Sequence, residues 1–202
     1  MIPPDPTPML TYARLGQMLG IDLYVKRDDL FPTPGGGNKG RKIGYIAEHA
    51  RSSGADALVT TGGTQSNHAR EVALAAAGHG WRCRLVLHGD SAEMRRPQGN
   101  LKLMLLAGAE VEIVSPDQIS GRMANAMDRL AEEGSSPYEI PGGGHTLEGA
   151  QAYADACAEV LAQCEAHSWL PDLVIHASGT GTTQAGLVVG FRSLGLTTQV
   201  IG

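Results

Sequence analysis

Short apolar, β-branched runs alternate with stretches of helical periodicity along almost the whole chain. Apolar residues that recur every three or four positions predict a helix, and a short continuous apolar run predicts a buried strand. Strands are expected at 22–29, 56–63, 83–89, 110–114, 172–177 and from 198 onward, with helices at about 43–54, 67–80, 98–109, 115–130, 146–164 and 182–195. This βαβ repetition predicts an α/β fold in which helices cover both faces of parallel sheets.

The loops that follow the predicted strands are the places to look for function. In open parallel sheets, functional groups gather at the carboxyl ends of the strands. The loops with suitable residues are PGGGNK (34–39), TGGTQSNH (61–68), HGD (88–90), PGGGH (141–145) and ASGTGTT (177–183).

Composition and charge narrow the class of protein. The 202 residues are 42% hydrophobic and 18% charged, with a formal net charge of −5, as is typical of one or two globular domains. The negative balance and the absence of a basic run argue against nucleic acid or an anionic membrane as the main partner. The sequence has no span of about 20 apolar residues and no secretory leader pattern. We therefore expect a cytoplasmic protein that acts on a small molecule.

The cysteines and histidines do not suggest a metal site. Cys83, Cys157 and Cys164 lack the C-x-x-C spacing of metal or redox motifs. We expect them to be buried thiols, because a free cysteine behaves as a small hydrophobic residue. His145 and Glu148 could ligate a metal, but no third ligand is evident nearby. No metal is therefore expected.

The segment Ser178–Thr183, SGTGTT, follows a predicted buried strand and precedes a helix that should start near Thr182. Converging backbone N–H groups and the positive end of the helix dipole predict a site for an anion such as a phosphate monoester. A Walker A motif is excluded because no Gly-Lys-Ser/Thr follows. The dinucleotide fingerprint is half matched by Gly179 and Gly181, with Gln184 at the third glycine position. A dinucleotide-binding oxidoreductase and a tight turn without a ligand remain alternatives.

Three glycines lead directly into Asn38 and Lys39. Consecutive glycines cost conformational entropy and are kept where the backbone must come close to something. Taken alone, Lys39 would more commonly be a solvated residue at a helix start. Together with a phosphate cradle it forms the combination that a pyridoxal 5'-phosphate site requires, because its amine can form an imine with the aldehyde. Burial and a cationic neighbour, Lys42 or Arg41, would favour the neutral and reactive amine.

A third loop supplies hydroxyl, amide and imidazole groups at the start of a predicted helix. Ser66, Asn67 and His68 lie in TTGGTQSNHAR (60–70), where the free N–H groups of a first helical turn suit a carboxylate. The alternative is a plain helix cap, since Ser and Asn are favoured cap residues.

The motifs GGGNKGRK (35–42), TTGGTQSNHAR (60–70) and ASGTGTTQAG (177–186), in this order, resemble the pyridoxal-phosphate enzymes that include D-cysteine desulfhydrase and 1-aminocyclopropane-1-carboxylate deaminase. The resemblance runs from about Pro8 to the end of the chain. It implies two three-layer parallel-sheet domains of the tryptophan synthase β-subunit fold, called fold type II. Residues 1–50 and 155–202 would form the large cofactor domain, incomplete at its C-terminus, and residues 51–154 the small domain.

The same resemblance assigns roles to residues of the three motifs. Lys39 would carry the cofactor covalently and move the proton at the substrate Cα, and Asn67 would hydrogen-bond the cofactor's phenolic oxygen. The phosphate would be held by Gly179, Thr180, Gly181, Thr182 and Thr183. Lys42 would help to set the local electric field.

On the substrate side, the resemblance implies that Ser66 takes part in catalysis and that Ser66, Asn67 and His68 bind the amino acid. The loop at 142–149 would line the site from the small domain. His68 after Ser-Asn is similar to the desulfhydrase and sulfo-lyase members, which favours α,β-elimination of D-cysteine or a close analogue to pyruvate, ammonia and sulfide. The alternatives are 1-aminocyclopropane-1-carboxylate deaminase activity, cysteate sulfo-lyase activity, or a cofactor-binding fragment without turnover.

The chain ends inside a predicted strand, at Gly202. In the family, the partner of the pyridine nitrogen and a tyrosine over the substrate come from later segments. We therefore expect a truncated chain, and a homodimer for the full-length protein.

Overall fold

The structure, a computed structural model, describes residues 6–166 and 168–202. Its N-terminal part is an antiparallel pair of three-residue strands, β1 (Met9–Thr11) and β2 (Tyr24–Lys26), with the short helix α1 (Ala13–Leu19) between them. The predicted strand at 22–29 is therefore too long. It ends early because residues 28–30 form a 3-10 turn whose first carboxylate, that of Asp28, is bound by Arg41.

A four-stranded parallel sheet forms the middle of the chain. Its strands are β3 (Ala57–Gly63), β4 (Arg82–His88), β5 (Glu110–Val114) and β6 (Pro137–Ile140), in the order β5-β4-β3-β6. The helices between them are α3 (Asn67–His79), α4 (Gly99–Leu106) and α5 (Ile119–Glu132). The parallel α/β arrangement predicted from the alternating pattern is confirmed here.

Helices cover both faces of this sheet, because successive residues of a strand point to opposite sides. Leu58, Leu85 and Leu87 pack in one core with residues of α3 and α4. Val59 and Val86 pack in a second core with residues of α5. Strands buried on both faces read as continuous apolar runs, which is why they were recognisable in the sequence.

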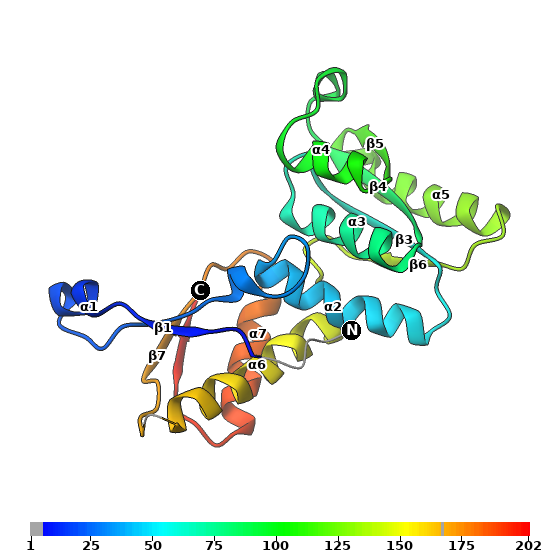
Figure 1. Cartoon of the computed structure of the whole chain (residues 1–202). Helices are drawn as coiled ribbons and strands as arrows, with labels where there is room; N and C mark the ends of the chain where they lie inside the picture. Colours follow the sequence, from blue (N-terminus) through cyan, green and yellow to red (C-terminus); the bar gives the residue numbers. More distant parts are fainter. Residues whose placement is uncertain (1–5, 167) are drawn as a thin grey trace.

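The remaining elements are the helix α2 (Gly37–Ser52) and a second group. This group consists of the helices α6 (Leu147–Glu165) and α7 (Thr182–Ser193) and the parallel strands β7 (Leu173–Ile175) and β8 (Gln199–Ile201). Phe191 of α7 and Cys157 of α6 share a buried cluster with residues of β7 and β8. Figure 1 shows α2 running between this group and the group formed by α3, α4 and α5. The start of α2 therefore lies where both groups can contribute side chains.

Arg41 fixes α2 against its neighbours. The residue is 1% exposed, and its guanidinium donates to both carboxylate oxygens of Asp28, at 2.8 and 2.9 Å, and to both of Glu159 on α6, at 2.6 and 3.0 Å. The guanidinium also lies over the ring of Phe31, 4.6 Å from its centre. The turn that precedes Lys39 and the helix that follows it are thus tied to one buried cation.

The three cysteines are free and buried, as predicted. Burial raises the pKa of Cys83 and that of Cys157, each to about 12, so neither is an available thiolate at neutral pH. In the described part of the chain, no helix has both the length and the apolar character needed to cross a membrane.

Candidate active site

Lys39 lies in the first turn of α2, and its amine meets the loop that follows β6. Its Nζ donates a hydrogen bond to the carbonyl oxygen of Gly143 at 3.1 Å. Lys42, one turn further along, donates to the same oxygen at 2.7 Å. One backbone carbonyl therefore holds two amines from neighbouring turns of a helix.

The two amines differ in their surroundings, and Lys42 is the more buried, at 1% exposed. Loss of solvent, followed by the nearby charge of Lys39, lowers the pKa of Lys42 to about 7. A substantial share of Lys42 is therefore neutral near pH 7, and it gains charge readily when an anion approaches. The sequence had pointed to Lys42 only as a neighbour that acts on Lys39.

Two of the three glycines before Lys39 are required by contacts within the protein. A Cβ on Gly35 would collide with the carboxylate of Glu71, and one on Gly36, at φ +61°, would collide with the carbonyl of Asp29. These two glycines let the turn pack against α3 and the preceding 3-10 turn. An approach of the same turn to a cofactor stays a prediction.

The turn before α7 lies next to the same loop. Gly181 adopts a left-handed conformation, with φ +80°, immediately before Thr182 begins the helix. Thr182 and Thr183 are buried, whereas Thr180 is exposed and its hydroxyl lies 3.2 Å from that of Thr182. A Cβ on Gly143 would come within 2.5 Å of the methyl carbon of Thr180.

Two further hydrogen bonds join this turn to the other loops. Asn38 Nδ2 donates to Thr183 Oγ1 at 3.4 Å, and His145 Nδ1 lies 3.0 Å from Thr182 Oγ1. The fold thus brings the loop at 142–146, the start of α2 and the predicted anion turn into contact, although the start of α2 is more than 100 residues from the loop along the chain.

At the start of α3, Ser66 is the cap residue and accepts a hydrogen bond from Ala69 N at 3.2 Å. The plain-cap interpretation therefore describes the Ser66 hydroxyl as it stands. A Cβ on Gly62 would lie 2.7 Å from that hydroxyl, so the end of β3 approaches the cap closely. The predicted contact of Ser66 with a substrate stays a prediction.

His68 is 3% exposed, and its ring is anchored on the sheet. Thr60 Oγ1 donates to Ile140 O at 2.6 Å, so its remaining contact, with His68 Nε2 at 2.8 Å, requires an N–H on that nitrogen. Burial, and then the charges of Lys39 and Lys42, lower the pKa of His68 to about 3. The imidazole is therefore neutral, with a lone pair on Nδ1.

That Nδ1 atom is buried and has no hydrogen-bond partner among the described residues. A Cβ on Gly144 would lie 3.7 Å from it, so it faces the same loop whose neighbouring carbonyl binds the two lysines. An acceptor that is shielded from water and lacks a donor is unusual in a folded protein, and it suits a bound molecule that supplies one.

Asn67 is exposed at the start of α3. Its Oδ1 accepts hydrogen bonds from Asn100 Nδ2 at 2.9 Å and from Arg70 Nη1 at 3.3 Å. Arg70 Nη2 also donates to Gly35 O at 3.2 Å, so Asn67 is linked to the turn before Lys39 through an arginine.

Sequence reasoning did not foresee Asn38, Arg70 or Asn100 as parts of this site. Asn38 and Arg70 lie inside the recognised motifs, so their position there was the available signal. Asn100 is far from them in sequence and had no local signal beyond its place at the start of α4.

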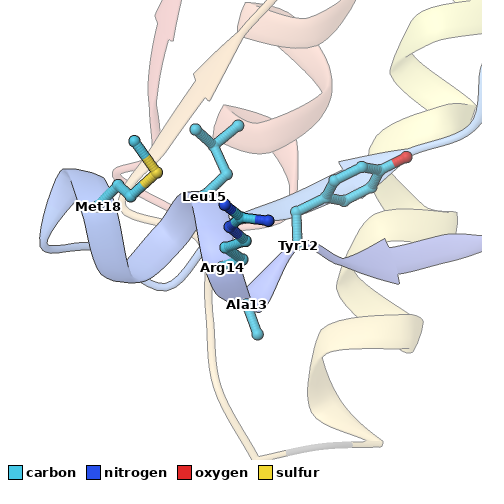
Figure 2. A pocket seen from close by; sticks show the side chains of 5 residues that line it. All are labelled: Tyr12, Ala13, Arg14, Leu15 and Met18. Carbon is cyan, nitrogen blue, oxygen red and sulfur yellow. The ribbon is translucent and has the colours of Figure 1, made fainter.

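A hollow elsewhere on the surface does not belong to this arrangement. It measures about 410 Å³ and lies beside α1, lined by Tyr12, Ala13, Arg14, Leu15 and Met18. Figure 2 shows these side chains around the short helix. None of them comes from the loops that carry Lys39, Asn67 or Thr182.

The converging loops can be compared with known proteins. A model of one protein family, described as "Pyridoxal-phosphate dependent enzyme", matches residues 3–202. The chain belongs to this family. The cofactor inferred from Lys39 and the glycine-threonine turn is thus the cofactor of the family, and the dinucleotide alternative is set aside.

Among curated members of the family, D-cysteine desulfhydrase of Salmonella typhi is 37% identical over 204 residues, which is 98% of this chain and 61% of the relative. D-cysteine desulfhydrase of Salmonella newport (strain SL254) has the same identity and coverage. The chain therefore spans 61% of the length of these curated relatives.

Solved structures of similar proteins agree with the fold. A crystal structure of an ACC deaminase homologue is 33% identical and superposes with a TM-score of 0.86, covering 96% of this chain and 59% of that one. A threonine deaminase from T.th. is 24% identical with a TM-score of 0.75, over 96% of this chain and 57% of that one, and shows the fold alone. The predicted fold type II is confirmed.

Proposed function

We propose that this chain is the cofactor-binding part of a pyridoxal-phosphate-dependent lyase that eliminates the β-substituent of a small amino acid, in the manner of D-cysteine desulfhydrase. The products would be pyruvate, ammonia and sulfide. The observation that carries the proposal is the convergence of the Lys39 amine, the buried threonines that begin α7, and the start of α3 around one loop.

The residues of the site suit the cofactor in three ways. The first turn of α7 offers N–H groups and the hydroxyls of Thr182 and Thr183 for a phosphate. Lys42, with its lowered pKa of about 7, becomes charged readily beside an anion. His68 Nδ1 is an acceptor without a donor in the described part of the chain. Each of these features gains from a bound anion or donor, which supports the assignment.

Within this proposal, Lys39 carries the cofactor covalently and moves the proton at the substrate Cα. The phosphate is held by Gly179, Thr180, Gly181, Thr182 and Thr183. Asn67 donates to the cofactor's phenolic oxygen. When bound, the cofactor supplies an electron sink for the pair of electrons released at Cα.

On the substrate side, Ser66, Asn67 and the first N–H groups of α3 bind the carboxylate, and Ser66 assists catalysis. The neutral ring of His68 presents a lone pair to the same space, where it can accept a hydrogen bond from the amino acid or from an amine. Because the imidazole is buried and held by Thr60, it would orient a group without exchanging protons with solvent.

The proposal includes the organisation of the whole protein. Residues 1–50 with 155–202 would form a large cofactor domain and residues 51–154 a small one, in a cytoplasmic homodimer. The core that contains Val59, Val86 and Leu130 lies wholly within the proposed small domain and supports this division. Helix α2 packs against both parts, because its Ile43, Ile46 and Ala50 share a core with the same sheet.

The decisive experiment combines cofactor capture with product analysis. Purified protein mixed with pyridoxal phosphate should gain a visible absorption band, and borohydride followed by peptide mass analysis should find the added mass on Lys39. A Lys39→Ala variant should show no trapped cofactor, whereas the surface control Lys102→Ala should be trapped as in the unaltered protein. A colourless protein that leaves added cofactor free would contradict the proposal.

A second activity, deamination of 1-aminocyclopropane-1-carboxylate, is favoured by the similarity to the ACC deaminase homologue. A protein that carries the full length of the curated relatives can be offered D-cysteine, cysteate and 1-aminocyclopropane-1-carboxylate separately. Sulfide from D-cysteine supports the first proposal, sulfite from cysteate a sulfo-lyase, and ammonia from the cyclopropane alone the deaminase.

A further inference from the structure

The amide of Asn67 is held from one side by two donors, and this fixes which of its atoms faces them. One terminal atom of the Asn67 amide lies 3.3 Å from Arg70 Nη1 and 2.9 Å from Asn100 Nδ2. A guanidinium has only donors, so the atom that it meets must be the carbonyl oxygen Oδ1. A flipped amide would place an NH₂ group against a cation.

Asn100 is itself unable to flip. Its Nδ2 also donates to the backbone oxygen of Gln65 at 2.8 Å, and its Oδ1 accepts from Arg70 Nη1 at 3.1 Å. Its backbone N–H donates to the side-chain oxygen of Gln65 at 3.0 Å. Each polar atom of the Asn100 side chain therefore has a hydrogen-bond partner that is compatible only with the observed orientation of the amide.

Arg70 is anchored in turn by the next residue of its own helix and by the turn before Lys39. Its Nε and Nη2 donate to Glu71 Oε1 at 3.1 and 2.9 Å, and Nη2 also donates to Gly35 O at 3.2 Å. Glu71 is 2% exposed and accepts a hydrogen bond from Thr33 Oγ1 at 3.3 Å. The arginine thus spans from the turn before Lys39 to the side chain of Asn67.

With Oδ1 engaged, Asn67 has only its NH₂ group to offer, and none of the described residues receives a hydrogen bond from it. We propose that Arg70 and Asn100 are positioning residues, which hold the Asn67 amide so that Nδ2 is the donor presented to the cofactor's phenolic oxygen. This inference rests on the proposed cofactor site and extends it to two residues that touch neither cofactor nor substrate.

The consequence is electrostatic and can be read from the colour of the bound cofactor. A donor to the phenolic oxygen stabilises the negative charge of that oxygen. The charge is larger after loss of the proton that the oxygen shares with the Lys39 nitrogen bound to the cofactor. The donor therefore lowers the pH at which the visible band titrates. Its loss should raise that pH midpoint, by about one unit for a hydrogen bond to a charged group.

The test compares pH titrations of the visible band in four proteins loaded with pyridoxal phosphate: the unaltered chain, Asn67→Ala, Asn100→Asp and the double variant. An aspartate at position 100 keeps the size of the side chain but cannot donate to Asn67 Oδ1, which frees the amide to turn. We expect both single variants to raise the midpoint by about one pH unit, and the double variant to match Asn67→Ala, because Asn100 acts only through Asn67.

Controls separate positioning from folding. Lys102→Ala alters the same helix as Asn100 at an exposed site and should leave the midpoint unchanged. Thermal melting of the cofactor-free proteins checks that each variant is folded. If Asn100→Asp does not fold, Asn100→Ala removes the same donor without adding a charge and is read in the same way.

The outcomes distinguish this inference from the proposed function. If the unaltered chain shows no cofactor band, the proposed site and the inference both fail. If Asn67→Ala shifts the midpoint but Asn100→Asp does not, or if the two shifts add in the double variant, the site stands and the positioning role is refuted. A shift in both single variants that does not add supports it.

Discussion

Replacing Arg41 by leucine should destabilise this protein more than any exposed arginine replacement on the same helix. Arg41 is 1% exposed, and its guanidinium makes two hydrogen bonds to each of two carboxylates and a fifth to the hydroxyl of Thr7. Leucine fills much of the volume but leaves Asp28 and Glu159 without their shared counter-ion. Uncompensated negative charge would then remain at the junction of α2, α6 and the 3-10 turn.

The magnitude follows from how buried the partners are. Removing one member of a buried ion pair typically costs about 3–5 kcal/mol. The side chains of Asp28 and Glu159 are 17% and 27% exposed, and Glu159 keeps Lys26 at 2.9 Å while Asp28 keeps Tyr153 at 2.7 Å. We therefore expect a loss of about 3 kcal/mol, equivalent to a fall in Tm of roughly 6–12 °C for a chain of this size.

The loss should also depend on pH. Burial by itself would raise the pKa of Asp28, but the hydrogen bonds and charge of Arg41 outweigh it and lower that pKa. A carboxylate with a lowered folded-state pKa stabilises the fold above its unfolded pKa, which is about 3.9, and this stabilisation is lost as the pH falls through the folded value. The difference between Arg41→Leu and the unaltered protein should therefore be full at pH 7 and shrink in acid.

Urea unfolding of the cofactor-free protein at pH 7 and near pH 3.5 measures both effects. Arg51→Leu is the matched control, because Arg51 lies on the same helix and pairs with Glu48 at 2.6 Å at an exposed site. Such surface pairs contribute little, so this control should unfold like the unaltered protein. Equal unfolding free energies for Arg41→Leu and the unaltered protein at pH 7 would refute the reasoning.

Further predictions concern charge, the site loop and the thiols. The pKa of Lys42 is lowered to about 7 in the folded chain, so the unfolded chain binds more protons above pH 7. The free energy of unfolding should therefore rise by up to about 1.4 kcal/mol per pH unit from pH 7 toward 10. Urea titrations should show that Lys42→Met abolishes this rise and that Lys102→Met does not. Gly143→Ala places a methyl group 2.5 Å from a threonine carbon and should weaken cofactor binding about tenfold or more by fluorescence titration, whereas Gly108→Ala, with a similar positive φ and open space, should leave affinity unchanged. Because burial raises the pKa of Cys83 to about 12, thiol reagents at pH 8 should label it only after denaturant is added, and labelling of the folded chain would contradict its burial.

Much of the fold could be predicted because its signals are local. The strands of the parallel sheet are buried on both faces, so they appear in the sequence as continuous apolar runs. Helix α3 starts after a serine cap, and α7 starts after a glycine with positive φ. The antiparallel pair of β1 and β2 gave no such signal, because strands of three residues depend on pairing with each other. The strand expected at 22–29 was too long because residues 28–30 form a 3-10 turn, in which the Asp28 carboxylate binds Arg41 of α2.

The motifs around Lys39, Asn67 and Thr182 could be recognised from residue types and spacing alone, and with them the family and its cofactor. What only the tertiary structure decided is how these groups are held and charged. That Lys39 and Lys42 share one carbonyl, and that Arg70 and Asn100 fix the amide of Asn67, follows from contacts between segments distant in sequence. Burial and orientation belong to the packed chain, because solvent is excluded and donors meet acceptors only after the segments have come together.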